Sequence, residues 1–176
     1  MLEIVIGAVV VLSLISLILT IYNNKYQFAI IKLDKAEEEI SLYLQRKKEL
    51  LERCKPIINK ELKKEDYFVE LDKDLNEMNN FEVNDFLKVI YNKLFKILDE
   101  NDKLFKSESL MAVVNDLSEN EEKIIGAIKY YNDNVVDFNK LILSFPSSII
   151  ALFKRYKKKE FYNNEKREIF EIINKE

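Results

Sequence analysis

Side chains that could carry out catalysis or bind a metal are scarce in this chain. It contains no histidine and a single cysteine, Cys54. These absences exclude the usual zinc sites, the Ser-His-Asp and Cys-His nucleophile pairs, and the Glu-x-x-His di-iron motif of helical bundles. Gly7 and Gly126 stand alone, which excludes a Walker loop and a dinucleotide fingerprint. We therefore expect no catalytic residues, no bound metal, no cofactor and no enzymatic activity, and we expect Cys54 to be a buried or half-buried thiol.

One class of catalysis stays open, because carboxylates alone can act as general acids and bases. Glu121 is the candidate, since it interrupts an otherwise apolar helix face. Two structural roles compete with catalysis: Glu121 extends to the rim of that face, or it pairs with a cation such as Lys47 on the first helix. A deep polar pocket around Glu121 would favour the hydrolase or isomerase alternative.

The longest uncharged stretch of the chain begins at Ile4 and ends at Tyr22. About 19 helical residues at ~1.5 Å each span roughly 28 Å, close to the ~30 Å hydrocarbon core of a bilayer. We predict a transmembrane anchor over residues 1–23 that contacts the lipid bilayer. A cleaved signal peptide would have basic residues before the apolar run, and a buried core helix would need other fully apolar segments around it.

The positions of the cations predict the orientation of this anchor. No Lys or Arg precedes the apolar stretch, whereas Lys25, Lys32 and Lys35 follow it closely. Because basic residues near a span stay on the cytoplasmic side, we expect the N-terminal end outside the cell membrane and residues 24–176 in the cytoplasm.

The composition of residues 24–176 is typical of long helices. The whole chain has two Gly and two Pro, with 34% charged and 48% hydrophobic residues. We predict an all-α fold in which the transmembrane helix continues into one domain, an antiparallel (up-and-down) four-helix bundle with long helices.

Apolar periodicity and breakers predict the helix boundaries. The first helix should run through Pro56, with a bend, to about residue 64. A second, capped by Asn84, should end near residue 101, and a third should start after Ser107 or Ser109 and end before Pro146. A fourth should cover residues 147 to about 159, and the amphipathic segments 65–80 and 165–174 are less regular.

Two helix faces repeat apolar residues at alternating spacings of four and three, the pattern of a packed seam. The first is interrupted by Glu37 and Lys47 and the second by Glu121. The first face comprises Tyr26, Ile30, Leu33, Glu37, Ile40, Leu44, Lys47, Leu51, Cys54 and Ile58, and the second comprises Leu110, Val114, Leu117, Glu121, Ile124, Ile128, Tyr131, Val135, Phe138 and Ile142.

The second seam runs into a distinctive set of residues with fixed gaps: Tyr131, Asn132, Val135, Phe138, Asn139, Phe145, Pro146 and Ala151. In these residues and their spacing the chain resembles the LemA family of bacterial membrane proteins. The resemblance implies an N-terminus outside, a cytoplasmic helical bundle and no established enzymatic activity. Because family members are often encoded beside membrane proteases and other envelope proteins, it also implies an adaptor or scaffold that binds such proteins at the membrane.

Two interpretations of this signature stay open. Asn132 and Asn139 lie one heptad apart beside the seam, so they are placed to hydrogen-bond a neighbouring helix and fix its register. Alternatively, Tyr131, the two asparagines and the Phe145–Pro146 corner form a docking surface for a partner protein. We favour the packing interpretation, and the sequence does not indicate the oligomeric state.

A basic run extends from Lys154 to Lys159 and could bind anionic lipid or nucleic acid. In an up-and-down bundle the third helix leads away from the membrane, so we expect Pro146 and this run to lie far from lipid. We favour a solvent-exposed helix face and expect no nucleic acid to bind, since the net charge is −3 with both signs mixed. A membrane-tethered nucleic-acid binder is the alternative.

Overall fold

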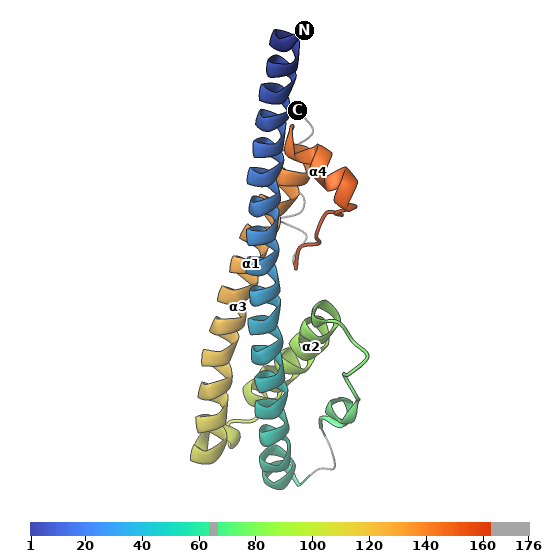
Figure 1. The fold of residues 1–176 in the computed structure, drawn as a ribbon. Coiled ribbons are helices and arrows are strands. Elements are labelled where there is room, and N and C mark those ends of the chain that lie inside the picture. The colour runs from blue at the N-terminus through green and yellow to red at the C-terminus, as the bar shows by residue number, and fades with distance from the viewer. Residues whose placement is uncertain (64–66, 163–176) are drawn as a thin grey trace. The chain divides into compact units, whose positions relative to one another are not determined.

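A computed structural model describes residues 1–63 and 67–162 of the chain. Its helices are α1 (Leu2–Leu62), α2 (Asn80–Asp99), α3 (Glu108–Leu143) and α4 (Ser147–Lys154), with short 3-10 helices at Val69–Asp72 and Leu104–Lys106 (Figure 1). Within the described ranges there is no strand. The prediction of an all-α fold with one long apolar N-terminal helix is confirmed.

The apolar stretch and the first seam form a single helix of 61 residues, as predicted. Pro56 lies inside α1, and the helix continues for six residues beyond it. The helix ends at Leu62, and Lys63 then takes a left-handed conformation with φ 49°. A positive φ is a common way to terminate a helix, because it turns the chain away from the axis.

The chain forms two compact units. The first contains residues 1–36 and 130–176, and the second contains residues 37–129. α1 and α3 each contribute to both units. The predicted seams supply core residues in both, since Tyr26, Leu33, Tyr131 and Val135 are almost fully buried in the first unit.

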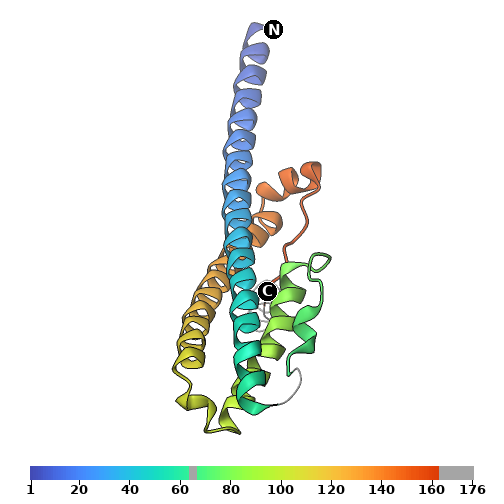
Figure 2. The ribbon, with the colours of Figure 1, turned by 90° about the horizontal axis from the view of Figure 1, so that it is seen from below.

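In the second unit α2 packs beside the C-terminal half of α1 (Figure 2). The fully buried side chains of this unit include Ile40, Leu44, Leu51, Cys54, Ile58, Leu87, Leu94 and Leu117. Lys55 binds Asp72 at 3.0 Å and Lys93 binds Glu70 at 2.7 Å, which ties the 3-10 helix Val69–Asp72 to α1 and α2. The segment predicted as irregular thus supplies Phe68 and Leu71 to the core.

The predicted start of α2 is wrong by several residues. Asn79, rather than Asn84, caps the helix: its side chain accepts from the Glu82 amide at 3.1 Å, and the Glu82 carboxylate accepts from the Asn79 amide at 2.9 Å. This capping box satisfies two amides that have no partner within the helix, so the helix begins one turn earlier. The predicted end of this helix near residue 101 and the start of α3 after Ser107 are confirmed, since α2 ends at Asp99 and α3 begins at Glu108.

The predicted fourth helix is too long, because α4 has 8 residues and ends at Lys154. Arg155 adopts φ 55°, and the Tyr156 amide donates to the Ala151 carbonyl at 2.9 Å. This arrangement closes the helix and redirects residues 155–162 as a non-helical segment, hereafter the 155–162 segment. The segment predicted for residues 165–174 lies outside the described residues.

Candidate functional site

The signature residues divide into a buried group and an exposed corner. Tyr131, Asn132, Val135, Phe138 and Asn139 are each at most 2% exposed, whereas the Phe145 side chain is 82% exposed. α3 presents the buried group toward the core of the first unit. Side chains that are this buried are not available as a docking surface, which favours the packing interpretation for the group as a whole.

Asn132 and Asn139 bind the backbone of the 155–162 segment. The Asn139 amide group donates to the Lys159 carbonyl at 3.0 Å, and its oxygen accepts from the Lys159 amide at 2.8 Å. The Asn132 oxygen accepts from the Tyr162 amide at 3.0 Å. We predicted a neighbouring helix as the partner, whereas these hydrogen bonds of the two asparagines go to the non-helical 155–162 segment.

The corner between α3 and α4 is joined to α1 through Tyr26. The Tyr26 hydroxyl donates to the Leu141 carbonyl at 2.7 Å and lies 3.2 Å from the Ser147 carbonyl. The buried Ser147 hydroxyl lies 2.7 Å from the Leu141 carbonyl and 2.8 Å from that of Ser144. The contacts to Leu141 satisfy a carbonyl that the last turn of α3 leaves without a helical partner. Burial raises the pKa of Tyr26, which keeps the donating hydroxyl protonated.

Aromatic rings extend this contact. The Tyr26 ring lies 5.9 Å from Phe138 and 5.0 Å from Tyr156, and the Tyr131 ring lies 5.1 Å from Tyr162. Tyr26, Ser147 and Tyr156 were missed as site residues by sequence reasoning. The available signal was the position of Tyr26 as the first residue of the first seam, directly after the apolar stretch.

These contacts contradict the expectation that Pro146 and the basic run lie far from the apolar stretch. Tyr26 is only four residues beyond Tyr22, and its hydroxyl reaches the first residue of α4. An up-and-down path requires helices of similar length, whereas α2 has 20 residues and α3 has 36. α3 thus returns to the end of the apolar stretch.

In the second unit, Glu121 is paired with Lys47, which confirms that hypothesis. The Lys47 ammonium lies 2.6 Å from Glu121 Oε2, and the Lys47 side chain is fully buried while that of Glu121 is 22% exposed. The ammonium also lies 4.7 Å from the centre of the Tyr91 ring. Burial lowers the pKa of Lys47, and the hydrogen bond and charge of Glu121 oppose that shift.

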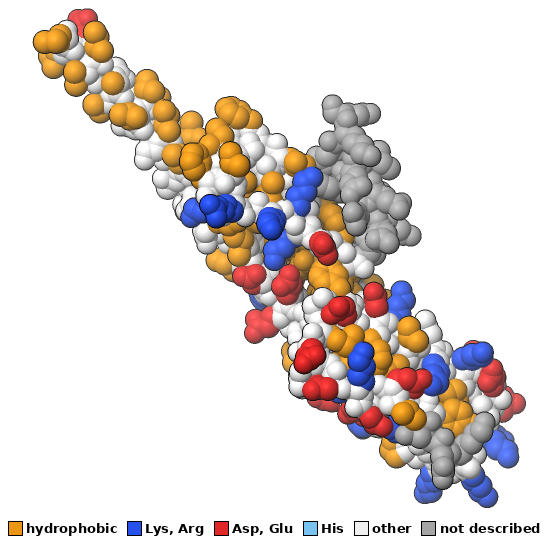
Figure 3. Space-filling view, turned by 90° about the vertical axis from the view of Figure 1, so that its right-hand side faces the viewer, with side chains coloured by type: hydrophobic (Ala, Val, Ile, Leu, Met, Phe, Trp, Pro, Cys, Tyr) orange, Lys and Arg blue, Asp and Glu red, His pale blue; other side chains and the backbone are white. Residues whose placement is uncertain are grey.

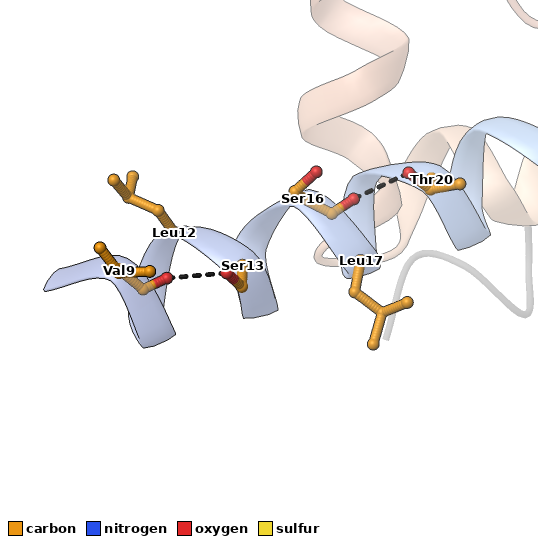
Figure 4. Close-up of a pocket in the computed structure, with 6 residues that line it drawn as sticks. All are labelled: Val9, Leu12, Ser13, Ser16, Leu17 and Thr20. Carbon is orange, nitrogen blue, oxygen red and sulfur yellow. Dashed lines mark hydrogen bonds between the residues drawn. The ribbon is translucent and has the colours of Figure 1, made fainter. Parts of the chain in front are cut away.

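The surface cavities of the described structure include one on α1 and one in the second unit. One, of about 560 Å³, is a shallow face of α1 lined by Val9, Leu12, Ser13, Ser16, Leu17 and Thr20 (Figure 4). The other, of about 500 Å³, is lined by residues that include Glu49, Glu52 and Asp74 in the second unit. Neither is lined by Glu121, and no group of residues suited to a metal occurs in the described ranges.

Two of the three hydroxyl side chains that line the cavity on α1 hydrogen-bond to their own helix. Ser13 donates to the Val9 carbonyl at 2.8 Å and Thr20 donates to the Ser16 carbonyl at 2.9 Å (Figure 4). Such internal bonds let hydroxyl groups lie in an apolar environment without an unsatisfied donor. The face is therefore compatible with lipid contact and does not require a ligand.

α1 is the one described helix that is by itself long and apolar enough to cross a membrane, and none of its most apolar window is buried. α3 and α4 pass the same test only as a pair, bent by 95° at their junction. These properties depend on length and composition, and they are compatible with membrane anchoring through α1.

Comparison with known proteins gives one family. No curated protein and no solved structure matches the chain. The family model for the LemA family matches residues 36–172, which is most of the chain and includes all the signature residues. The buried seam of α3, its two asparagines and the Phe145–Pro146 corner thus lie within the matched region, and the chain belongs to the LemA family.

Proposed function

We propose that this protein is a single-pass membrane protein whose helical domain binds other proteins at the cytoplasmic face of the cell membrane and carries out no catalysis. Its partners are membrane or envelope proteins, among them a membrane protease. The observation that carries the anchoring part is the exposure of the apolar stretch. Every residue from position 1 to 21 is exposed, although most of them are apolar.

Exposure of this kind is costly in water, because burial of apolar surface stabilises by about 25 cal/mol per Å². Figure 3 shows hydrophobic side chains covering the visible face of the N-terminal end, with Lys and Arg appearing only farther along. A lipid bilayer removes this surface from water without a protein partner. The basic residues Lys25, Lys32 and Lys35 then favour a cytoplasmic location for the remainder of the chain.

Binding is favoured over catalysis by the state of the candidate carboxylate. Glu121 is occupied by Lys47, so its role in this arrangement is to neutralise a buried cation. The buried signature side chains of α3 are occupied by contacts within the unit as well, so a docking surface has to use exposed apolar positions. Phe28 and Ile31 are each 62% exposed on α1, close to the apolar stretch.

Site-specific photo-cross-linking in living cells tests the adaptor role. A photo-reactive residue would replace Phe28, Ile31 or the 60%-exposed Ile125, with the fully buried Val135 as a matched control position. We expect a discrete heterologous adduct from at least one exposed position and none from Val135. Adducts with the same chain alone, or no adducts, would contradict a protein-binding adaptor.

Alkaline carbonate extraction of membranes tests anchoring separately. The full-length protein should stay in the membrane pellet, and a variant with Leu12→Arg and Ile15→Arg should be released, because each charge at the centre of a span costs ~2.5–3.5 kcal/mol on insertion scales. The control carries Arg at the exposed positions Leu42 and Val89, outside the apolar stretch. Release of the unmodified protein would refute the anchor.

A further inference from the structure

We propose that α4 and the basic turn after it form a second membrane contact, in which α4 lies on the bilayer surface beside the transmembrane part of α1. This inference rests on the membrane anchoring proposed above. The occupant of the apolar face of α4 is the same bilayer that α1 crosses.

The first argument is position. The Tyr26 hydroxyl lies 3.2 Å from the carbonyl of Ser147, the first residue of α4. Tyr26 follows the end of the apolar stretch by four residues, or roughly 6 Å along a helix. Figure 1 shows α4 next to the N-terminal part of α1, and α3 running antiparallel to α1 up to this point. α4 therefore lies at the level where α1 leaves the membrane.

The second argument is direction. The axis of α4 is bent by 95° from that of α3. Because α3 runs alongside α1 in this unit, a helix at a right angle to α3 lies approximately in the plane of a membrane that α1 crosses. This is the orientation of interfacial amphipathic helices, which bury one face at the boundary between headgroups and acyl chains.

The third argument is the distribution of apolar side chains around α4 and its corner. Ile150 and Ala151 are buried against the unit, at 6% and 4% exposure. On the outer face, Phe145, Leu152 and Phe153 are 82%, 78% and 83% exposed. Two of these are aromatic, and a bilayer interface accommodates such side chains more favourably than water does.

The fourth argument is charge. Lys154, Arg155, Lys157 and Lys158 are exposed and follow the apolar face directly. No Asp or Glu occurs from residue 138 to 159. Anionic lipids attract basic clusters of this kind at the cytoplasmic surface. An apolar face bordered by basic residues matches a membrane surface. The basic residues after α4 add to the positive charge of Lys25, Lys32 and Lys35, which follow the span.

Depth-dependent fluorescence quenching in lipid nanodiscs tests this contact in the full-length protein. In a Cys54→Ala background, an environment-sensitive fluorophore is attached at Leu152→Cys, at Leu12→Cys within the span, or at the 68%-exposed Val89→Cys of the second unit. The nanodiscs contain phosphatidylcholine with or without phosphatidylglycerol. The quencher is a nitroxide on a shallow acyl carbon for positions 152 and 89 and, in separate nanodiscs, a nitroxide near the end of the acyl chain for position 12.

We expect emission from position 152 to be blue-shifted and quenched several-fold more than emission from position 89. Replacing Lys154, Lys157 and Lys158 with Gln should reduce this quenching in anionic nanodiscs, whereas Arg155 is retained because of its positive φ. Quenching at position 12 without quenching at position 152 would overturn the surface contact and leave the anchor intact. Absence of quenching at both positions would refute the anchor itself.

Other occupants of the α4 face give distinct results. If a second copy covers it, emission at position 152 is blue-shifted but insensitive to the lipid quencher, and it changes with the number of chains in each nanodisc. If the face is exposed to water, emission at position 152 matches that at position 89. Either result overturns the proposal.

Discussion

The ammonium of Lys47 lies 2.6 Å from the carboxylate of Glu121, at a position where the lysine side chain has no exposed surface. Glu121 interrupts an otherwise apolar seam on α3, and Lys47 is one of two charged residues in the seam of α1. In this ion pair the carboxylate neutralises the buried ammonium, so a charged residue of α1 and one of α3 form a single contact between the two helices. The Tyr91 ring, 4.7 Å from the ammonium, adds a cation–π contact to this arrangement.

Breaking this pair should destabilise the protein more than removing it as a unit. Glu121→Gln leaves a buried lysine without its counter-charge, and Lys47→Met leaves a partly buried carboxylate, so we expect losses of roughly 2–4 kcal/mol for each. The double variant should lose less than the sum, with a coupling of about 1–3 kcal/mol. Denaturant unfolding of the full-length protein in detergent micelles measures all four corners of the cycle. Additive losses would show that the pair is not coupled.

The Asn139 side chain makes both of its hydrogen bonds to Lys159, so its loss should release the 155–162 segment. We expect Asn139→Ala to cost about 1–3 kcal/mol in local stability, because partly buried backbone groups of Lys159 lose these two hydrogen bonds. Trypsin cleavage at Lys157 and Lys158 then becomes faster. Asp137→Ala, an exposed change two residues away, is the matched control. Equal cleavage rates for the two variants would contradict this role.

The Tyr26 hydroxyl connects α1 to the corner after α3. Tyr26→Phe keeps the ring contacts with Phe138 and Tyr156 and removes the hydroxyl that donates to the carbonyls of Leu141 and Ser147. We expect a loss of about 1–2 kcal/mol and faster hydrogen exchange in α4. Tyr130→Phe, on a side chain that is 43% exposed, should have little effect. Unchanged exchange in α4 for Tyr26→Phe would show that the hydroxyl does not hold the corner.

Burial raises the pKa of the Cys54 thiol to about 11 from 9.0. The folded protein therefore keeps a proton that the unfolded chain loses between these values. The stability contributed by the neutral thiol is fully present below about pH 9 and is lost as the pH rises toward 11, by at most ~3 kcal/mol.

A Cys54→Ala variant has no thiol to ionise, so its stability does not fall with pH for this reason. The difference in unfolding free energy between the natural sequence and Cys54→Ala should thus shrink as the pH is raised from 8 to about 10.5. Denaturant titrations at a series of pH values measure it, and the comparison cancels the contributions of the tyrosines. Parallel pH profiles would indicate a thiol with an ordinary pKa.

The helix faces could be predicted from sequence because their signal is local. Residues spaced by three and four lie on one side of a helix wherever the helix is placed, so the seams from Tyr26 to Ile58 and from Leu110 to Ile142 were recognisable. The same spacing suggested the Lys47–Glu121 pair as one of two structural roles for Glu121, since charged interruptions in two packed seams can neutralise each other. The apolar stretch could also be recognised from sequence, because its length and its lack of charged residues are local properties of the chain.

Only the tertiary structure decided where α3 ends in space and what the signature asparagines bind. The end of α4 depends on Arg155 at φ 55° and on Tyr156, whose ring packs against Tyr26, 130 positions away in the chain. The basic run alone continues a helical pattern, so local propensity predicts a longer helix than the one observed. Long-range contacts outweigh that propensity here. The Tyr156 ring can pack against Tyr26, and the two asparagines can bind the backbone, only when the 155–162 segment leaves the helix.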